Sequence, residues 1–116
     1  MEKLIDKIKS PSDLKQLTIP QLTQYADEVR DFIISSVEKN GGHLSSNLGA
    51  VDFVIALHYV FDCPNDKLIF DVGHQAYTHK IITGRKDGFD NLRHDNGVSG
   101  FVNVAESIYD CCTMGH

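Results

Sequence analysis

The sequence predicts part of an α/β layer fold, rich in helix and with one short parallel strand. Two observations lead to this prediction. The elements follow the order helix, helix, strand, helix. The single strand candidate, residues 67–71, has the apolar character of a strand buried in a parallel sheet. Because one strand cannot form a sheet, we expect an incomplete domain whose other strands lie outside these 116 residues.

The first long helix is predicted over residues 19–39. Thr18 and Gln21 have the spacing of a capping box, and Pro20 lies in the first turn, where its missing N–H costs nothing. Apolar residues then recur at intervals of three and four, as they do along a buried helix face. The run Asn40-Gly41-Gly42 is a typical helix stop.

The other elements are predicted from similar signals. They are a polar approach segment over 1–17, a loop over 41–49, a helix over 48–60, a turn over 63–66, the strand over 67–71 and a helix over 75–83. Ser45, Ser46 and Asn47 are candidate N-caps of the second helix. Gly84 is expected to end the last helix, and glycines beyond Arg85 break the chain into turns.

Composition narrows the class of protein. The chain is long enough for one domain, and its hydrophobic content of 41% is ordinary for a soluble protein. The formal net charge of −5 argues against a nucleic-acid partner, which would require a basic face. No signal peptide or membrane span is predicted. Three cysteines are too few for a disulfide framework, so we expect a cytoplasmic protein.

The first candidate site surrounds His43, within the glycine-flanked run of residues 41–49. Glycines allow a close backbone approach, and an imidazole on a loop can transfer protons near neutral pH. The N-terminus of the following helix would also favour an anion. Spacing alone favours the alternative, a helix stop followed by a polar cap and an exposed histidine without a role.

The second candidate site follows the predicted strand. Asp71 ends the strand, His74 lies in the next turn and Lys80 lies further along, at the edge where open α/β sheets bind ligands. His74 could donate to a phosphate there, and Lys80 could add positive charge. The alternative is an ordinary strand-to-helix turn in which His74 and His79 are surface histidines.

Other candidates are weaker. The histidines and cysteines lack zinc spacing, and neither of the adjacent Cys111 and Cys112, expected to point apart, has a catalytic partner at fixed spacing. His58 lies among apolar residues and is predicted to be a core histidine. Several charged residues are predicted to lie on solvated surfaces: Glu28, Asp52, Arg85-Lys86-Asp87 and Arg93-His94-Asp95.

A resemblance to a known enzyme family extends from about residue 14 onward. It is carried by GGHLSSNLG at 41–49, DKLIFDVGHQAYTHKIITGR at 66–85 and GVSGF at 97–101. These runs resemble the 1-deoxy-D-xylulose-5-phosphate synthase family of transketolase-like thiamine diphosphate enzymes. The resemblance implies a partial N-terminal thiamine-diphosphate-binding domain over 1–116. It also implies a homodimeric full-length enzyme that joins pyruvate to glyceraldehyde 3-phosphate, with loss of carbon dioxide, for isoprenoid, thiamine and pyridoxal precursors.

The resemblance also assigns roles to particular residues. His43 matches the histidine that transfers protons near the reactive thiazolium carbon, and His74 matches the one that contacts the cofactor diphosphate. Gly115 and His116 match the start of a stretch that lines the same cofactor. The family's Mg²⁺ is held by a Gly-Asp-Gly motif and a downstream asparagine, and this chain contains neither.

Two departures from the family pattern lie near the C-terminus. Residues 102–105 read VNVA where the family has a basic run, and Ile108 replaces a glutamate. The loss of the basic run weakens the case for phosphate binding there.

Three hypotheses follow for the chain. It is an inactive N-terminal piece of the synthase, a non-catalytic interaction module, or one subunit of a split enzyme. The last ranks lowest, because split enzymes of this type normally keep the magnesium motif in their first subunit.

Overall fold

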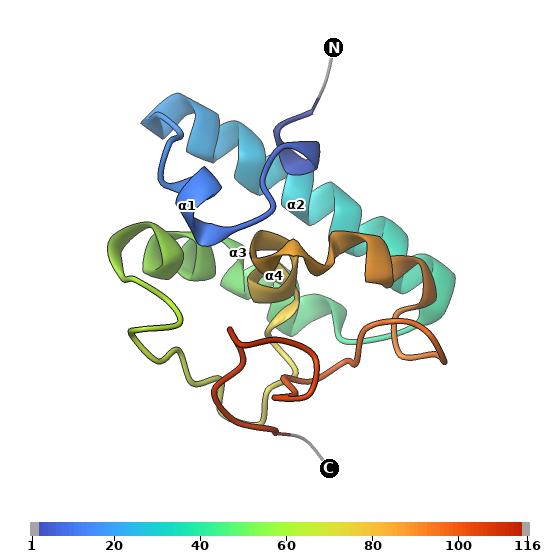
Figure 1. Cartoon of the computed structure of the whole chain (residues 1–116). Coiled ribbons are helices and arrows are strands. Elements are labelled where there is room, and N and C mark those ends of the chain that lie inside the picture. Colours follow the sequence, from blue (N-terminus) through green and yellow to red (C-terminus); the bar gives the residue numbers. More distant parts are fainter. Residues whose placement is uncertain (1–2, 115–116) are drawn as a thin grey trace.

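The computed structural model describes residues 3–114, and helices form all of the regular structure in that part of the chain (Figure 1). The elements are η1 (Leu4–Asp6), α1 (Pro11–Leu14), α2 (Ile19–Asn40), α3 (Leu44–Val60), α4 (Tyr77–Lys80), η2 (Ile81–Arg85) and η3 (Lys86–Asn91). Helices α2 and α3 are the longest and pack against each other. No helix within residues 3–114 has both the length and the apolar character needed to cross a membrane.

Helix α2 confirms the prediction made for residues 19–39 and is one residue longer. Thr18 Oγ1 accepts a hydrogen bond from the Gln21 backbone N–H at 3.3 Å, and Gln21 Oε1 accepts one from the Thr18 N–H at 2.8 Å. Both hydrogen bonds of the predicted capping box are therefore formed. Gly41 ends the helix with φ +78°, a backbone conformation that favours glycine.

Helix α3 begins at Leu44, four residues before the predicted start, so the expected loop over residues 41–49 is wrong for most of its length. His43, rather than Ser45, Ser46 or Asn47, occupies the N-cap position, and no side chain caps the helix. The Asn47 side chain is buried and bonds to two loop carbonyls. This tertiary role replaces the local capping that the sequence suggested.

The strand predicted over residues 67–71 is not confirmed, and with it the parallel-sheet part of the α/β prediction. Residues 67–70 have no regular secondary structure, and no strand occurs within residues 3–114. A strand requires a hydrogen-bonded neighbour, which the described part of the chain does not offer. Ile69 is 64% exposed, whereas a strand buried on both faces would hide it.

The helix predicted over residues 75–83 is shorter and then changes character. Helix α4 covers Tyr77–Lys80 and continues into the π-helical turn η2, whose helical geometry breaks at Thr83 and Gly84. Gly84 has φ +91°, and a Cβ there would lie 2.8 Å from the Lys9 carbonyl oxygen. The predicted glycine stop is thus confirmed. Helix η3 follows in a segment that the sequence predicted as turns.

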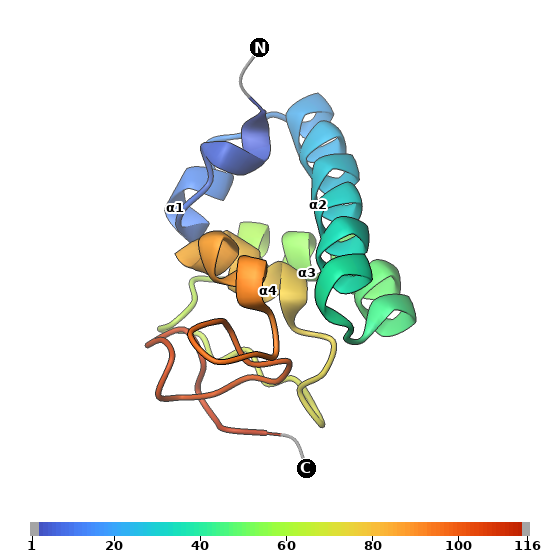
Figure 2. The same ribbon diagram turned by 90° about the vertical axis from the view of Figure 1, so that its right-hand side faces the viewer.

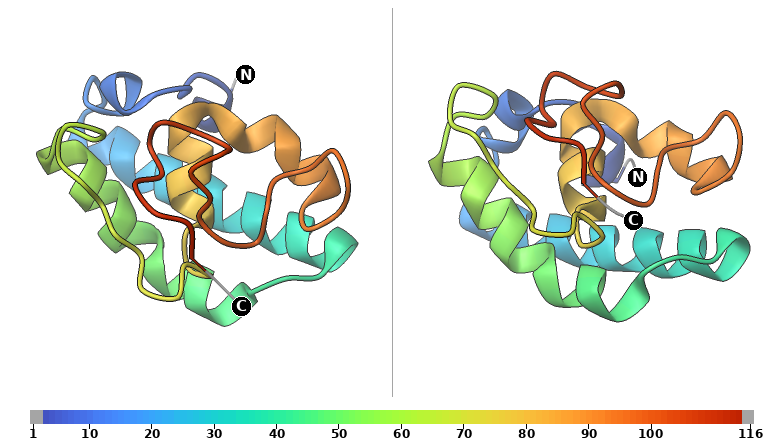
Figure 3. Two further views of the ribbon diagram at one scale, coloured as in Figure 1. Left: turned by 60° about the horizontal axis from the view of Figure 1, so that its bottom comes forward. Right: turned by 90° about the horizontal axis from the view of Figure 1, so that it is seen from below.

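The buried core lies between the helices: α2 packs against α3, α4 packs against α3, and η2 contacts α4, α1 and η3 (Figure 2). The irregular segments that precede α4 and follow η3 gather on the side opposite the N-terminal helices (Figure 3). The Cα radius of gyration is 13.0 Å. This value is close to the roughly 13 Å expected of a folded chain of this length.

Candidate functional site

His43 lies at the junction between α2 and α3 and contacts Tyr77 of α4. The Tyr77 hydroxyl oxygen lies 3.1 Å from His43 Nδ1 and 3.1 Å from the His43 backbone nitrogen, which donates to it. Gly42 makes this approach possible, because a Cβ there would lie 2.7 Å from the same hydroxyl. When the tyrosine donates to Nδ1, the neutral imidazole carries its proton on Nε2.

The two predicted histidine sites meet in the structure. The rings of His43 and His74 are in edge contact, with centroids 5.4 Å apart. Asn47 holds the two turns together: its Nδ2 donates to the carbonyls of His43 at 2.6 Å and of His74 at 2.8 Å. Its Oδ1 accepts from the Tyr77 N–H at 2.9 Å. The sequence placed Asn47 in the right motif but assigned it a capping role.

The surroundings of His43 favour its neutral form. Burial lowers the pKa of the His43 imidazole, and the neighbouring His74 and Arg93 lower it further. Burial raises the pKa of the Tyr77 hydroxyl, which keeps it protonated at neutral pH. His43 is therefore neutral at pH 7, and Nε2 is free to accept a proton when Nδ1 carries the ring proton and donates it to the Tyr77 hydroxyl oxygen.

The turn that carries His74 is strained and incompletely hydrogen bonded. Val72 has φ +64°, an unusual conformation for a β-branched residue, and strained backbone often accompanies functional sites. His74 Nδ1 is buried and has no hydrogen-bond partner within residues 3–114. An unsatisfied buried nitrogen destabilises a fold. This orphaned atom is compatible with a turn that gains a polar ligand.

A loop formed by residues 99–106 also packs against the His43 ring. The Phe101 ring is in edge contact with the His43 ring, with centroids 5.2 Å apart. A Cβ on Gly100 would lie 3.5 Å from His43 Cε1, so Gly100 lies beside the imidazole. The sequence resemblance included GVSGF at 97–101, but only the folded chain shows that this run contacts His43.

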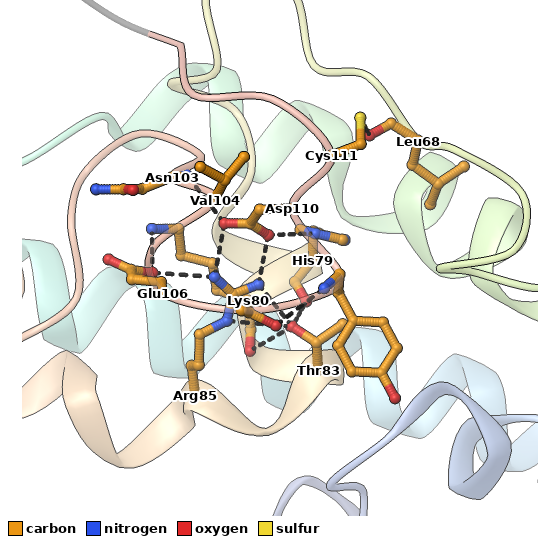
Figure 4. Close-up of polar contacts among 12 residues, drawn as sticks. Leu68, His79, Lys80, Thr83, Arg85, Asn103, Val104, Glu106, Asp110 and Cys111 are labelled. Atoms are coloured by element: carbon orange, nitrogen blue, oxygen red, sulfur yellow. Dashed lines mark hydrogen bonds and ion pairs between the residues drawn. The ribbon is translucent and has the colours of Figure 1, made fainter.

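A buried ionic cluster holds that loop in place (Figure 4). Lys80, which the sequence made a candidate phosphate ligand, is fully buried and pairs with Glu106 at 2.8 Å. Arg85, predicted to lie on a solvated surface, pairs with Glu106 at 2.9 Å and with both carboxylate oxygens of Asp110. Both assignments are corrected, because partners some 20 residues away leave no local signal in the sequence.

His79 is also buried, which corrects its interpretation as a surface histidine, whereas the core position predicted for His58 is confirmed. His58 Nε2 lies 2.8 Å from His79 Nδ1, and His79 Nε2 lies 2.9 Å from Asp110 Oδ1. Burial and His79 lower the pKa of His58 to about 3, and burial lowers that of His79. Burial alone would raise the pKa of Asp110, but hydrogen bonds from His79 and Arg85 hold it well below its usual range.

The cysteines differ from expectation. Cys111 Sγ and Cys112 Sγ lie 3.5 Å apart, although the two side chains were expected to point apart in a regular element. That prediction assumed a regular element, and residues 111–114 contain none. Cys63 is buried and Cys111 donates to the Leu68 carbonyl, which makes both part of the packing.

Two further predictions concern ligand binding. Gly115 and His116, the predicted cofactor-lining residues, lie outside the described residues. Within residues 3–114, no group of three or more histidine, cysteine or carboxylate side chains is arranged to hold a metal ion. The polar groups that come together within residues 3–114 are the imidazoles, the Tyr77 hydroxyl and the buried ionic cluster around Lys80 and Arg85.

Comparison with known proteins identifies the family. The 1-deoxy-D-xylulose-5-phosphate synthase family matches residues 5–116, which include both histidine motifs and the loop that covers them. The chain therefore belongs to this family and corresponds to its amino-terminal part.

Curated relatives agree with this assignment. The chain is similar to proteins named 1-deoxy-D-xylulose-5-phosphate synthase from Thermus thermophilus, Dictyoglomus turgidum and Chlamydia pneumoniae. Their sequences are 55%, 57% and 59% identical to this chain, respectively. Each match covers 97% of this chain, and the chain spans 18% of the length of each relative.

Proposed function

We propose that this chain supplies the cofactor-side histidines of a 1-deoxy-D-xylulose-5-phosphate synthase. The whole enzyme joins pyruvate to glyceraldehyde 3-phosphate, with loss of carbon dioxide, and requires thiamine diphosphate and Mg²⁺. One observation carries this proposal: two histidines 31 residues apart in sequence lie in ring contact. A single buried asparagine ties both of their turns together. Family membership supports the proposed reaction, and the contact between the two histidines supports the proposed proton transfer at His43.

His43 is the proton-transfer residue in this proposal. Thiamine diphosphate, held beside His43 and His74, would supply the chemistry of carbon–carbon bond formation. The His43 imidazole is neutral, its Nδ1 is within hydrogen-bond distance of Tyr77, and its ring is shielded by Phe101. A neutral imidazole oriented in this way can take a proton and return it.

His74 contacts the diphosphate in this proposal, and its buried, unpartnered Nδ1 fits a turn completed by a polar ligand. Gly115 and His116 would line the same cofactor. The magnesium ligands would come from other parts of a complete synthase. A second copy of that synthase would complete the homodimer. We also propose that residues 1–116 form part of the thiamine-diphosphate domain of a cytoplasmic enzyme without nucleic-acid or membrane partners.

A chimera tests this function. Residues 5–116 replace the matching segment of the Thermus thermophilus relative, and release of carbon dioxide is measured with pyruvate and glyceraldehyde 3-phosphate. We expect turnover, because the two sequences are 55% identical over this region. In the chimera, His74→Ala should weaken thiamine diphosphate binding about tenfold or more, because a charge-assisted hydrogen bond is worth about 1.5–3 kcal/mol.

The matched control is His94→Ala, which removes an exposed imidazole to which the proposal gives no role. A folded chimera that binds thiamine diphosphate but forms no product would contradict the proposed function. Equal cofactor affinity in the His74 and His94 variants would contradict the role proposed for His74.

A further inference from the structure

Lys80 ends α4 with an ammonium group that is completely enclosed by protein. Its Nζ donates to the Ser99 carbonyl at 2.8 Å, the Phe101 carbonyl at 2.7 Å and Glu106 Oε1 at 2.8 Å. An ammonium has three protons to donate, so each is used. A buried charge is strongly unfavourable unless it is paired and hydrogen bonded. This cluster therefore has a specific geometry to maintain.

The acceptors of Lys80 belong to the loop that contacts His43. The two carbonyls flank Gly100, which lies beside the His43 ring, and one of them belongs to Phe101, whose ring is in edge contact with that ring. Glu106 closes the loop by accepting the Ser99 N–H through Oε2 at 2.6 Å. Lys80 and Glu106 therefore fix the loop at both of its ends.

We propose that Lys80 is a positioning residue that holds the Gly100–Phe101 wall against the His43 imidazole. It acts through backbone carbonyls and does not touch the reacting atoms. The relevance of this wall to turnover rests on the proposed function, but its effect on His43 does not. Helix α4 thereby holds His43 from two sides, through the Tyr77 hydroxyl and through the wall fixed by Lys80.

The wall has a measurable effect on the titration of His43. The groups that face this imidazole are His74 from the strained turn, Tyr77 from α4, Arg93 from the segment after η3, and Phe101. Burial is the largest cause of the lowered pKa of His43, and Phe101 provides part of that burial. Releasing the wall admits water to the ring, which raises its pKa toward the ordinary value.

The test is an NMR titration of the His43 Cε1–H resonance in this chain and in Lys80→Met. We expect the pKa of His43 to rise by about 0.5 or more in the variant, because the ring is rehydrated. The ring-current shift from Phe101 should also disappear. Phe101→Leu should reproduce both effects with the ionic cluster intact, and adding Lys80→Met to it should raise the pKa no further.

Lys15→Met is the matched control. Lys15 also donates to three backbone carbonyls, those of His58, Tyr59 and Phe61, but none of them contacts His43. An unchanged His43 pKa in Lys80→Met, or an equal rise in Lys15→Met, would overturn the proposal.

If Lys80→Met does not fold, Glu106→Gln is titrated instead, because it removes the charge that pairs with Lys80. An unchanged pKa of His43 in that variant would overturn the proposal in the same way. Since no cofactor or turnover enters these measurements, their outcome is independent of the chimera assay.

Discussion

At the scale of single residues, Asn47 joins α3 to both histidine turns. Its side chain makes three hydrogen bonds, all to backbone groups of His43, His74 and Tyr77. The sequence could place Asn47 beside His43, because both lie in one motif. Its partners could not be predicted, because two of them lie about 30 residues away and local spacing carries no information about them.

Asn47→Ala tests the importance of these bonds. The substitution removes three hydrogen bonds to backbone groups, so we expect the free energy of unfolding to fall by about 2–4 kcal/mol. Urea denaturation followed by circular dichroism measures the change. Asn65→Ala is the control, because its amide only contacts an exposed carboxylate, Asp62. Equal stability of the two variants would show that the bridge contributes nothing.

The buried histidines predict a pH dependence of stability. The pKa of His58 is about 3 in the folded chain against 6.5 for an ordinary histidine, so the unfolded chain binds the extra proton. The free energy of unfolding should therefore fall as the pH drops from 6.5 toward 3, by about 1.4 kcal/mol per pH unit for this group. The lowered pKa of His79 also makes the free energy of unfolding fall as the pH drops. The lowered pKa of Asp110 does the same at pH values below the pKa that Asp110 has in the unfolded chain.

Denaturation at a series of pH values measures this slope. His58→Gln should reduce it, whereas removal of the exposed His94 should not. A slope unaffected by His58→Gln would mean that His58 is protonated in the folded chain.

At the scale of elements, the sequence predicted correctly those helices whose signals lie within a few neighbouring residues. The capping box and glycine stop of α2 are encoded within a few residues, and the helix formed as predicted. The start of α3 was missed because it depends on the tertiary role of Asn47. The strand over 67–71 was not confirmed because a strand depends on a neighbour, which its own sequence cannot specify.

Two glycines on different elements should respond in opposite ways to alanine. Gly84→Ala introduces a Cβ 2.8 Å from the Lys9 carbonyl oxygen at φ +91°, so we expect a loss of more than about 1 kcal/mol. Gly49 lies inside α3 with no atom within 4 Å of its Cβ position, so Gly49→Ala should add about 0.5–1 kcal/mol. Thermal denaturation distinguishes the two, and destabilisation by Gly49→Ala would contradict the placement of that residue.

At the scale of the whole molecule, the site is assembled from α3, α4, the turn at His74 and the loop over residues 99–106. The two histidine motifs were predictable as candidates, and the family resemblance linked them. The ionic cluster that fixes the covering loop was not predictable. Lys80 and Arg85 look like surface charges until the fold brings Glu106 and Asp110 to them.

We expect the isolated chain to form no 1-deoxy-D-xylulose 5-phosphate from pyruvate and glyceraldehyde 3-phosphate, even with thiamine diphosphate and Mg²⁺ present. The reason is that the chain spans 18% of the length of its curated relatives, and a diphosphate needs its cation and the residues that hold it in order to bind well. A coupled assay for carbon dioxide release measures this. Turnover above that of a buffer blank would contradict the expectation.

The rate of the active chimera with His43→Ala tests whether His43 transfers protons in the reaction. We predict that kcat falls about 100-fold or more, the usual contribution of a general acid or base. His94→Ala should leave kcat unchanged. A His43→Ala chimera that folds, binds thiamine diphosphate and retains the full kcat would contradict the claim.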